Sequence, residues 1–148
     1  MRNSKIQKLI NVGMVILVSA LPETALLASE LQLVNQQKPN QAESQLIGTW
    51  KGDSTCQVKN SPCHDEKAIY QISKSKEAGK VTIDLGKIVA GKAESMAVLD
   101  FTYDPVKQRL VCEQKYGVWE LIVEGDKMEG KLTTPDQVLY RRMSLKKE

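Results

Sequence analysis

The sequence predicts an all-β fold, a small eight-stranded antiparallel up-and-down barrel, preceded by a signal peptide and a mobile arm. From Leu46 onward, short β-like runs recur at regular intervals with turn-forming residues between them. No gap between these runs has room for the crossover helix that parallel strands require. Each clearly patterned run has a single apolar face, as the wall of a closed barrel demands. We expect three parts: 1–28 signal peptide, 29–45 flexible arm and 46–148 barrel domain.

The first 28 residues have the layout of a secretory signal peptide. Three basic residues precede an apolar run over 9–21, and small residues follow it. We expect cleavage after Ala28, with Ala20 as the alternative. Pro22 and Glu23 end the apolar run short of the roughly 20 residues that span a bilayer. We therefore expect an exported protein, periplasmic or extracellular, without a stable membrane span after cleavage; an uncleaved anchor is the alternative.

The mature chain is predicted to be nearly neutral. Removing three bases and one acid with the signal peptide, from 21 bases and 18 acids, leaves a net charge of +1. A chain of this charge has no electrostatic basis for binding nucleic acid. The segment 29–45 is rich in Gln, Asn and Ser, and this composition favours a mobile arm.

The runs predict strands over 46–55, 67–73, 80–88, 95–103, 109–115, 118–124, 127–133 and 138–146. Asp104-Pro105, Gly125-Asp126 and Pro135-Asp136 mark three of the turns, because Pro presets φ and Gly tolerates the left-handed region. In the last strand two phases remain open. Either Val138 and Tyr140 face inward, or the series Leu139, Arg141, Met143 and Leu145 does.

Five aromatic residues are the candidate ligand-binding residues of the barrel interior: Trp50, Tyr70, Phe101, Tyr103 and Trp119. An eight-stranded barrel has an interior that side chains fill, or that holds one small ligand. The low aromatic fraction, 5%, counts against a large pocket.

Cys56 and Cys63 are predicted to form a disulfide that closes a loop after the first strand, because the chain is expected to be exported. The alternative is a metal site in which His64 joins the two cysteines, with Asp65 or Glu66 as a further ligand. Cys112 is expected to be a buried free thiol. Pairing of this cysteine with another chain is its alternative.

Gly48-Thr49-Trp50, at the head of the first strand, resembles the Gly-x-Trp motif that opens lipocalins and related calycin barrels. The chain as a whole is similar to small exported bacterial barrels of this lipocalin-like type. In that family the Trp plugs one end of the barrel beneath an Arg of the last strand. The resemblance implies a structural pair between Trp50 and Arg141, with Arg142 as the other candidate. It departs from lipocalins in having a short folded part of 46–148 and no helix after the last strand.

The sequence also resembles the periplasmic metalloprotease inhibitors of bacteria, which are eight-stranded barrels that insert an N-terminal arm into the protease. The resemblance implies that 29–45 would be that arm. The spacing of Cys56 and Cys63 departs from that family, which bridges more distant positions.

No enzymatic activity is expected. His64 is the only histidine, and the sequence contains neither a phosphate-binding Gly loop nor zinc-finger spacing. We expect no cofactor, no metal and no catalytic residues. The predicted function is that of an exported, monomeric lipocalin-like binding protein for an unknown small apolar ligand. The alternatives are a protein-binding inhibitor with an exported protein partner, and an envelope protein without catalytic activity.

Overall fold

The computed structural model describes residues 42–148 of the chain. The predicted signal peptide, its cleavage sites and the arm up to residue 41 lie outside the described residues. In the described part of the chain, no helix is long and apolar enough to cross a membrane.

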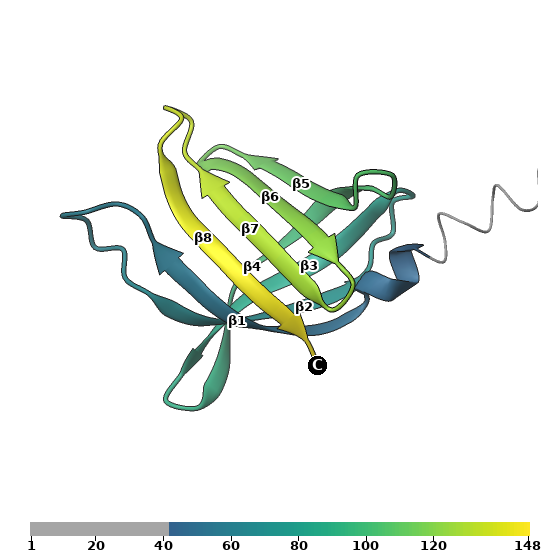
Figure 1. The fold of residues 1–148 in the computed structure, drawn as a ribbon, viewed down its shortest axis with the longest axis horizontal. Helices are drawn as coiled ribbons and strands as arrows, with labels where there is room; N and C mark the ends of the chain where they lie inside the picture. Colours follow the sequence, from purple (N-terminus) through teal and green to yellow (C-terminus); the bar gives the residue numbers. More distant parts are fainter. Residues whose placement is uncertain (1–41) are drawn as a thin grey trace, which may run out of the picture. The chain divides into compact units, whose positions relative to one another are not determined.

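Eight antiparallel strands form a closed barrel in chain order, and the last strand pairs with the first (Figure 1). The strands are β1 (Gly48–Cys56), β2 (Glu66–Lys74), β3 (Lys80–Val89), β4 (Lys92–Asp104), β5 (Arg109–Gln114), β6 (Gly117–Glu124), β7 (Lys127–Thr133) and β8 (Leu139–Lys147). The predicted fold class is confirmed, because every connection is a hairpin or a short loop between neighbouring strands.

The two ends of the barrel differ. We call the end that holds residues 42–46 and the C-terminus the closed end. We call the other the open end; it carries the loops 57–65, 90–91, 115–116 and 134–138. The loop 57–65 and the β3–β4 hairpin project from the open end (Figure 1).

The β3–β4 hairpin is longer than the sequence pattern predicts. β4 begins at Lys92 rather than at residue 95, so the turn contains only Ala90 and Gly91. Both residues have positive φ, 49° and 79°. Such a two-residue turn matches the right-handed twist of the strands on either side. The sequence after Gly91 does not show the alternation that predicts a strand, because this part of β4 is exposed on both faces and has no apolar side.

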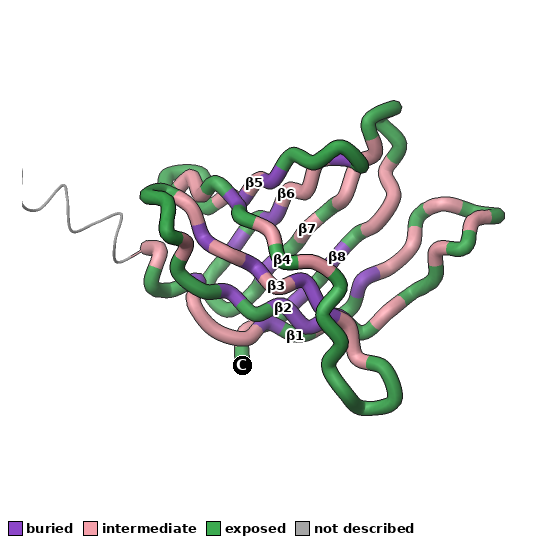
Figure 2. Tube along the Cα trace, turned by 180° about the vertical axis from the view of Figure 1, so that it is seen from behind, coloured by how far each residue is buried: buried purple, intermediate pink, exposed green. Residues whose placement is uncertain are grey.

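Apolar side chains fill the closed half of the barrel. Buried residues alternate along the strands in Figure 2, as the period of a half-buried strand requires. Trp50 is 0% exposed, and its Nε1 donates a hydrogen bond to the Leu46 carbonyl at 2.8 Å. Leu46 is itself buried at the end of a single helical turn over 42–46. This turn covers the closed end, in a segment that the sequence pattern assigned mostly to the arm.

The cation over Trp50 is Lys147 and not Arg141. The Lys147 Nζ lies 5.7 Å from the centroid of the indole and donates to the Gln45 carbonyl at 2.5 Å. The strand register explains the difference, because Trp50 is opposite Lys147 while Cys56 is opposite Arg141. Arg141 therefore lies at the other end of β1, and the pair implied by the family resemblance does not form.

In β8 the inward residues come mainly from the second alternative, but Tyr140 of the first alternative also faces the interior, and Leu139 lies on the outer face. Met143 and Leu145 are buried, whereas Val138 is exposed and precedes the strand. Arg141 belongs to the same inward series. Its side chain lies in the interior at the open end of the barrel.

The seam between β4 and β5 is the shortest in the barrel. Only three residue pairs join these strands, from Thr102 with Val111 to Asp104 with Arg109. Beyond Thr102 the two strands separate, and a surface opening lies between Asp100 on β4 and Cys112 on β5. Val98 on β4 is 60% exposed beside this opening.

Candidate functional site

A cup at the open end of the barrel is the candidate binding site. Its volume is about 200 Å³. Its wall is formed by side chains from seven strands: Ser54, Glu66, Ala68, Tyr70, Leu85, Met96, Ala97, Trp119, Leu132, Tyr140 and Arg141. Most of these side chains are apolar, and the few polar ones belong to β1, β2 and β8. A concave, mainly apolar site with a few converging polar groups is typical of small-molecule binding.

Two β-bulges bring consecutive residues into the wall of the cup. On β4 the pairing with β3 shifts at Leu85/Gly86, and Met96 is the extra residue next to Ala97. On β8 the pairing with β7 shifts at Leu132/Thr133, and Tyr140 is the extra residue next to Arg141. Because strict alternation would send one member of each pair outward, the bulges add a side chain at each position.

Arg141 is held rigidly in the wall of the cup. Its Nη1 donates to the Ser54 hydroxyl at 2.7 Å and lies 3.0 Å from the Glu66 Oε2. Its Nη2 donates to the His64 carbonyl at 2.8 Å. The side chains of Arg141 and Glu66 are only 11% and 12% exposed. A buried ion pair of this kind is stable only when further hydrogen bonds hold its members, which Ser54 and His64 provide here.

The second oxygen of Glu66 is less firmly bound. The Lys87 Nζ lies 3.9 Å from the Glu66 Oε1 and the His64 Nε2 lies 3.8 Å from it. Both distances exceed those of a hydrogen bond. Neither Lys87 nor His64 lines the cup. The charged residues in the wall are therefore Arg141 and Glu66, whose charges cancel.

Tyr70 has a free hydroxyl at the cup. The side chain is 1% exposed, and no described residue makes a hydrogen bond to its oxygen. Every fully buried side-chain nitrogen and oxygen within 42–148 has a partner, so this hydroxyl must be accessible through the cup. Burial raises the pKa of Tyr70 well above its ordinary value, with Arg141 acting against this and Glu66 adding to it. The group is therefore a protonated phenol that can donate a hydrogen bond.

The disulfide loop forms one side of the open end. Cys56 and Cys63 are bonded, with their Cα atoms 5.8 Å apart, which confirms the predicted pairing. The Asp65 carboxylate accepts a hydrogen bond from the Cys56 backbone N–H at 2.8 Å, and the His64 carbonyl accepts from Arg141. The loop is thus tied to the wall of the cup at its C-terminal end. Nowhere in residues 42–148 do three His, Cys, Asp or Glu side chains come together as a metal site.

The structure separates the predicted interior aromatics into two groups. Tyr70 and Trp119 line the cup. Trp50 and Phe101 are completely buried in the core, and Tyr103 packs against that core from a partly buried position. Cys112 is a buried free thiol, and its sulfur accepts a weak hydrogen bond from Gln114.

Sequence reasoning missed Ser54, Glu66 and Met96 as wall residues, and it gave an inward Tyr140 only as one of two phases of the last strand. Glu66 immediately follows the disulfide loop and was considered only as a metal ligand. Its inward position depends on the start of β2, which no turn signal marked. Met96 and Tyr140 depend on the bulges, which strict alternation does not reveal. The one available signal was Arg141 itself, a basic residue in an otherwise apolar inward series.

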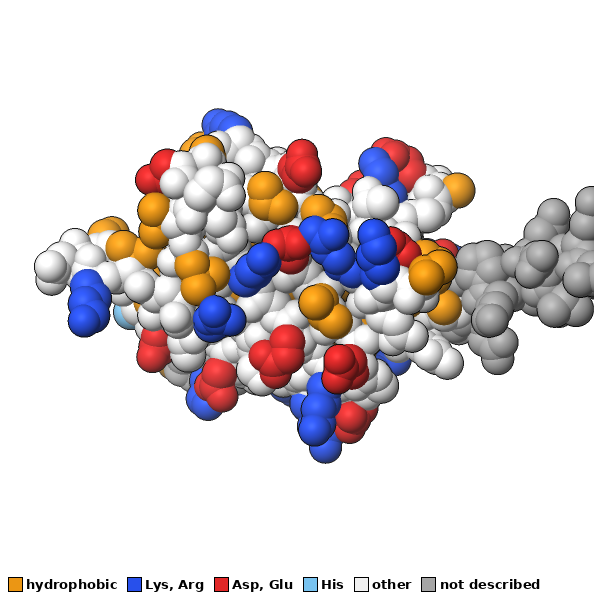
Figure 3. Space-filling view, turned by 45° about the horizontal axis from the view of Figure 1, so that its top comes forward, with side chains coloured by type: hydrophobic (Ala, Val, Ile, Leu, Met, Phe, Trp, Pro, Cys, Tyr) orange, Lys and Arg blue, Asp and Glu red, His pale blue; other side chains and the backbone are white. Residues whose placement is uncertain are grey.

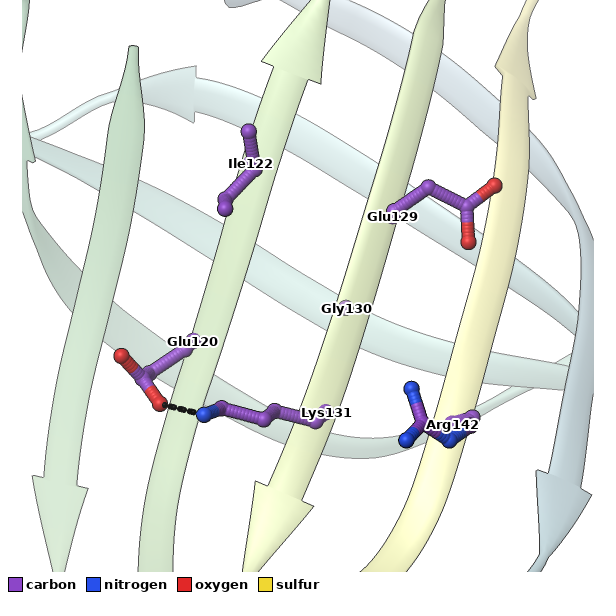
Figure 4. A pocket seen from close by; sticks show the side chains of 6 residues that line it. All are labelled: Glu120, Ile122, Glu129, Gly130, Lys131 and Arg142. Carbon is purple, nitrogen blue, oxygen red and sulfur yellow. Dashed lines mark ion pairs between the residues drawn. The ribbon is translucent and has the colours of Figure 1, made fainter. Parts of the chain in front are cut away.

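A shallow depression on the outer face of β6, β7 and β8 is the alternative site (Figure 4). Its volume is about 260 Å³ and it lies over Gly130. Glu120 in its wall is paired with Lys131 at 2.6 Å and with Arg109. The outer surface carries both signs of charge, interspersed with isolated apolar side chains (Figure 3). A network of paired charges on the outer face of a barrel is typical of a solvated surface, so we prefer the cup.

No family model matches this chain, and a search of the curated proteins gives no match either. The likeness to lipocalin-like barrels therefore rests on the Gly-x-Trp motif and the strand pattern. What the structure itself provides is the closed eight-stranded barrel and the cup at its open end.

Proposed function

We propose that this protein is an exported binding protein that holds one small, mainly apolar molecule in the cup. The observation that carries the proposal is the combination of an unfilled, mainly apolar recess with a free buried hydroxyl, Tyr70. The other half of the same barrel is occupied by a cluster of buried apolar side chains. A natural barrel that packs one half completely and leaves the other open has a use for the open half.

The size of the cup limits the ligand. An apolar cavity of about 150 Å³ binds one benzene molecule. A cup of about 200 Å³ therefore accommodates a single ring with one substituent, or a short branched chain. Long-chain lipids and multi-ring compounds would have to extend out of the open end.

Export is supported by the disulfide and by the sequence of the first 28 residues. Cys56 and Cys63 form a bond that persists in an oxidising compartment. The reading as a protease inhibitor depends on the arm, most of which lies outside the described residues, and it stays a prediction.

Two indole N–H signals in a proton–nitrogen correlation spectrum test the proposal. Trp119 lines the cup, whereas the Trp50 indole is bonded to Leu46 at the closed end. Titration with toluene should shift the Trp119 signal in a saturable way and leave the Trp50 signal in place. The Trp119→Phe variant assigns the two signals.

A pair of matched variants localises the binding. Ala97→Phe places a ring in the wall of the cup and should abolish the shift. Ala93→Phe makes the same change at an exposed position of β4 and should leave the shift intact. If toluene, indole and benzamide all leave the Trp119 signal unmoved up to their solubility limits, the cup is not a binding site and the proposal fails.

A further inference from the structure

We propose that the cup selects an uncharged ligand that carries one neutral polar group, and that this group binds to the Tyr70 hydroxyl. This inference rests on the proposed function and names the chemical class of its ligand. The class is a one-ring or short-chain molecule bearing a carboxamide, carbonyl or hydroxyl, as opposed to a carboxylate or an amine.

The first step is the charge balance of the wall. Arg141 and Glu66 are 3.0 Å apart and nearly buried, and they are the charged residues that line the cup; Lys87, 3.9 Å from Glu66, lies outside this lining. A charged ligand loses its hydration when it enters the cup. It then meets a pair of charges that cancel, so nothing compensates the loss.

The second step is that Arg141 is fixed. Ser54 and His64 hold its two terminal nitrogens in addition to Glu66. Turning the guanidinium toward an anionic ligand would break these bonds and leave the Glu66 carboxylate unpaired in a nearly buried position. Leaving a buried charge without its partner is strongly unfavourable.

The third step is the free hydrogen-bonding capacity. The Tyr70 hydroxyl has no hydrogen-bond acceptor among residues 42–148, and Tyr70 lines the cup. The Glu66 Oε1 has no hydrogen bond within residues 42–148; the His64 Nε2 and the Lys87 Nζ lie 3.8 Å and 3.9 Å from it. A neutral group that accepts from Tyr70, and that can donate to Glu66, matches this arrangement. A carboxamide has both capacities.

Three probes of the same shape and different charge test the inference: benzamide, benzoate and benzamidine. Their dissociation constants for the full chain are measured at about pH 7 by calorimetry, with the Trp119 indole signal as the site marker. We expect benzamide to bind at least tenfold more tightly than benzoate and than benzamidine. We also expect benzamide to bind more tightly than toluene, since toluene has no polar group. Benzoate or benzamidine equal to or tighter than benzamide would overturn the inference.

Variants then assign the effect to residues. Tyr70→Phe removes only the hydroxyl and should weaken benzamide binding about fivefold, the equivalent of one neutral hydrogen bond. Tyr116→Phe removes the hydroxyl of a tyrosine that is 74% exposed and lies outside the cup, and should change nothing. Equal affinity of Tyr70→Phe and the unaltered protein for benzamide would refute the role of the hydroxyl.

Glu66→Gln gives the sharpest contrast. This change leaves Arg141 without its counter-ion, so the preference should turn from benzamide to benzoate. An unchanged preference would contradict the charge-balance argument. The ranking of the three probes is measured on the unaltered protein, so this part of the test does not depend on the folding of any variant. If toluene binds but benzamide gains nothing over it, the inference fails while the proposed function stands; if no probe binds, the proposed function fails first.

Discussion

At the scale of single residues, Tyr70 is a buried phenol whose surroundings disfavour its ionised form. Of the charged residues that line the cup, Arg141 is the one that would stabilise a phenolate, and it is paired with Glu66. Buried phenols of this kind are normally bound to a partner. The free hydroxyl of Tyr70 therefore departs from this rule, and the stability of the fold does not require it.

The burial of Tyr70 makes the stability of the fold sensitive to alkali. Its pKa is raised in the folded protein by burial, so its contribution is fully present below the unfolded value of about 10. That contribution is lost as the pH rises above this value, because the unfolded chain releases the proton first. The free energy of unfolding is measured with urea at several pH values. Between about pH 9 and pH 11 it should fall by about 1 kcal/mol more in the unaltered protein than in Tyr70→Phe.

The exposed Tyr116 provides the control for this measurement. Tyr116→Phe removes a phenol hydroxyl that is 74% exposed, so it controls for the loss of a tyrosine that is not buried. An identical alkaline loss in Tyr70→Phe would show that other groups account for it.

At the scale of elements, the disulfide loop and the two bulges define the open end. The bond between Cys56 and Cys63 closes a short loop of sequence separation 7, and the strands on either side are already paired in the barrel. The disulfide is therefore expected to order the loop more than it stabilises the barrel.

Replacing both Cys56 and Cys63 by Ser should loosen the loop without unfolding the barrel. Closing a small ring stabilises the fold by roughly 2–3 kcal/mol at most. The melting temperature, measured by circular dichroism, should fall by less than about 15 °C. Chemical reduction of the unaltered protein should give the same decrease, since Cys112 is a free thiol and adds no second disulfide to be reduced. A larger fall would mean that the loop supports the barrel itself.

The elements also show what the sequence could and could not predict. Gly125-Asp126 and the alternation around Leu121 located two strands and their turn correctly, because a local pattern determines both. Met96 could not be placed and the phase at Tyr140 stayed open, because a bulge depends on the pairing of one strand with another and changes no local propensity. The role of Glu66 follows from its contact with Arg141, 75 residues later in the chain, which periodicity cannot indicate.

The expected Trp50–Arg141 pair was wrong for a related reason. Arg141, Arg142 and Lys147 are all cations of the last strand, and only the register of β8 against β1 decides which of them reaches the indole. That register is set by the pairing of the whole strand.

At the scale of the whole molecule, the closure between β1 and β8 holds the first and last described residues together. Gly52 is part of this closure, because a Cβ at this position would lie 2.0 Å from the Ser144 carbonyl oxygen. Near the end of the seam, the Glu148 backbone N–H donates to the Thr49 carbonyl at 3.0 Å. Lys147 adds the contact with Trp50 and the bond to the turn over 42–46.

Lys147→Met should weaken this closure. The change removes a cation near an aromatic face and a charged hydrogen bond, which together stabilise the fold by about 1–2 kcal/mol. Lys146→Met is the matched control, since Lys146 is the preceding residue and its side chain is 70% exposed. Urea unfolding should show a clear loss for the first variant and less than about 0.5 kcal/mol for the second. Equal losses would show that Lys147 does not fasten the closed end.

The separation of the two barrel ends has a practical consequence for how the molecule is held. Residues 42 and 148 both leave the barrel at the closed end, and the cup faces away from them. A support, a label or a partner domain joined next to residue 42 or residue 148 is thus attached at the closed end and leaves the entrance of the cup unobstructed.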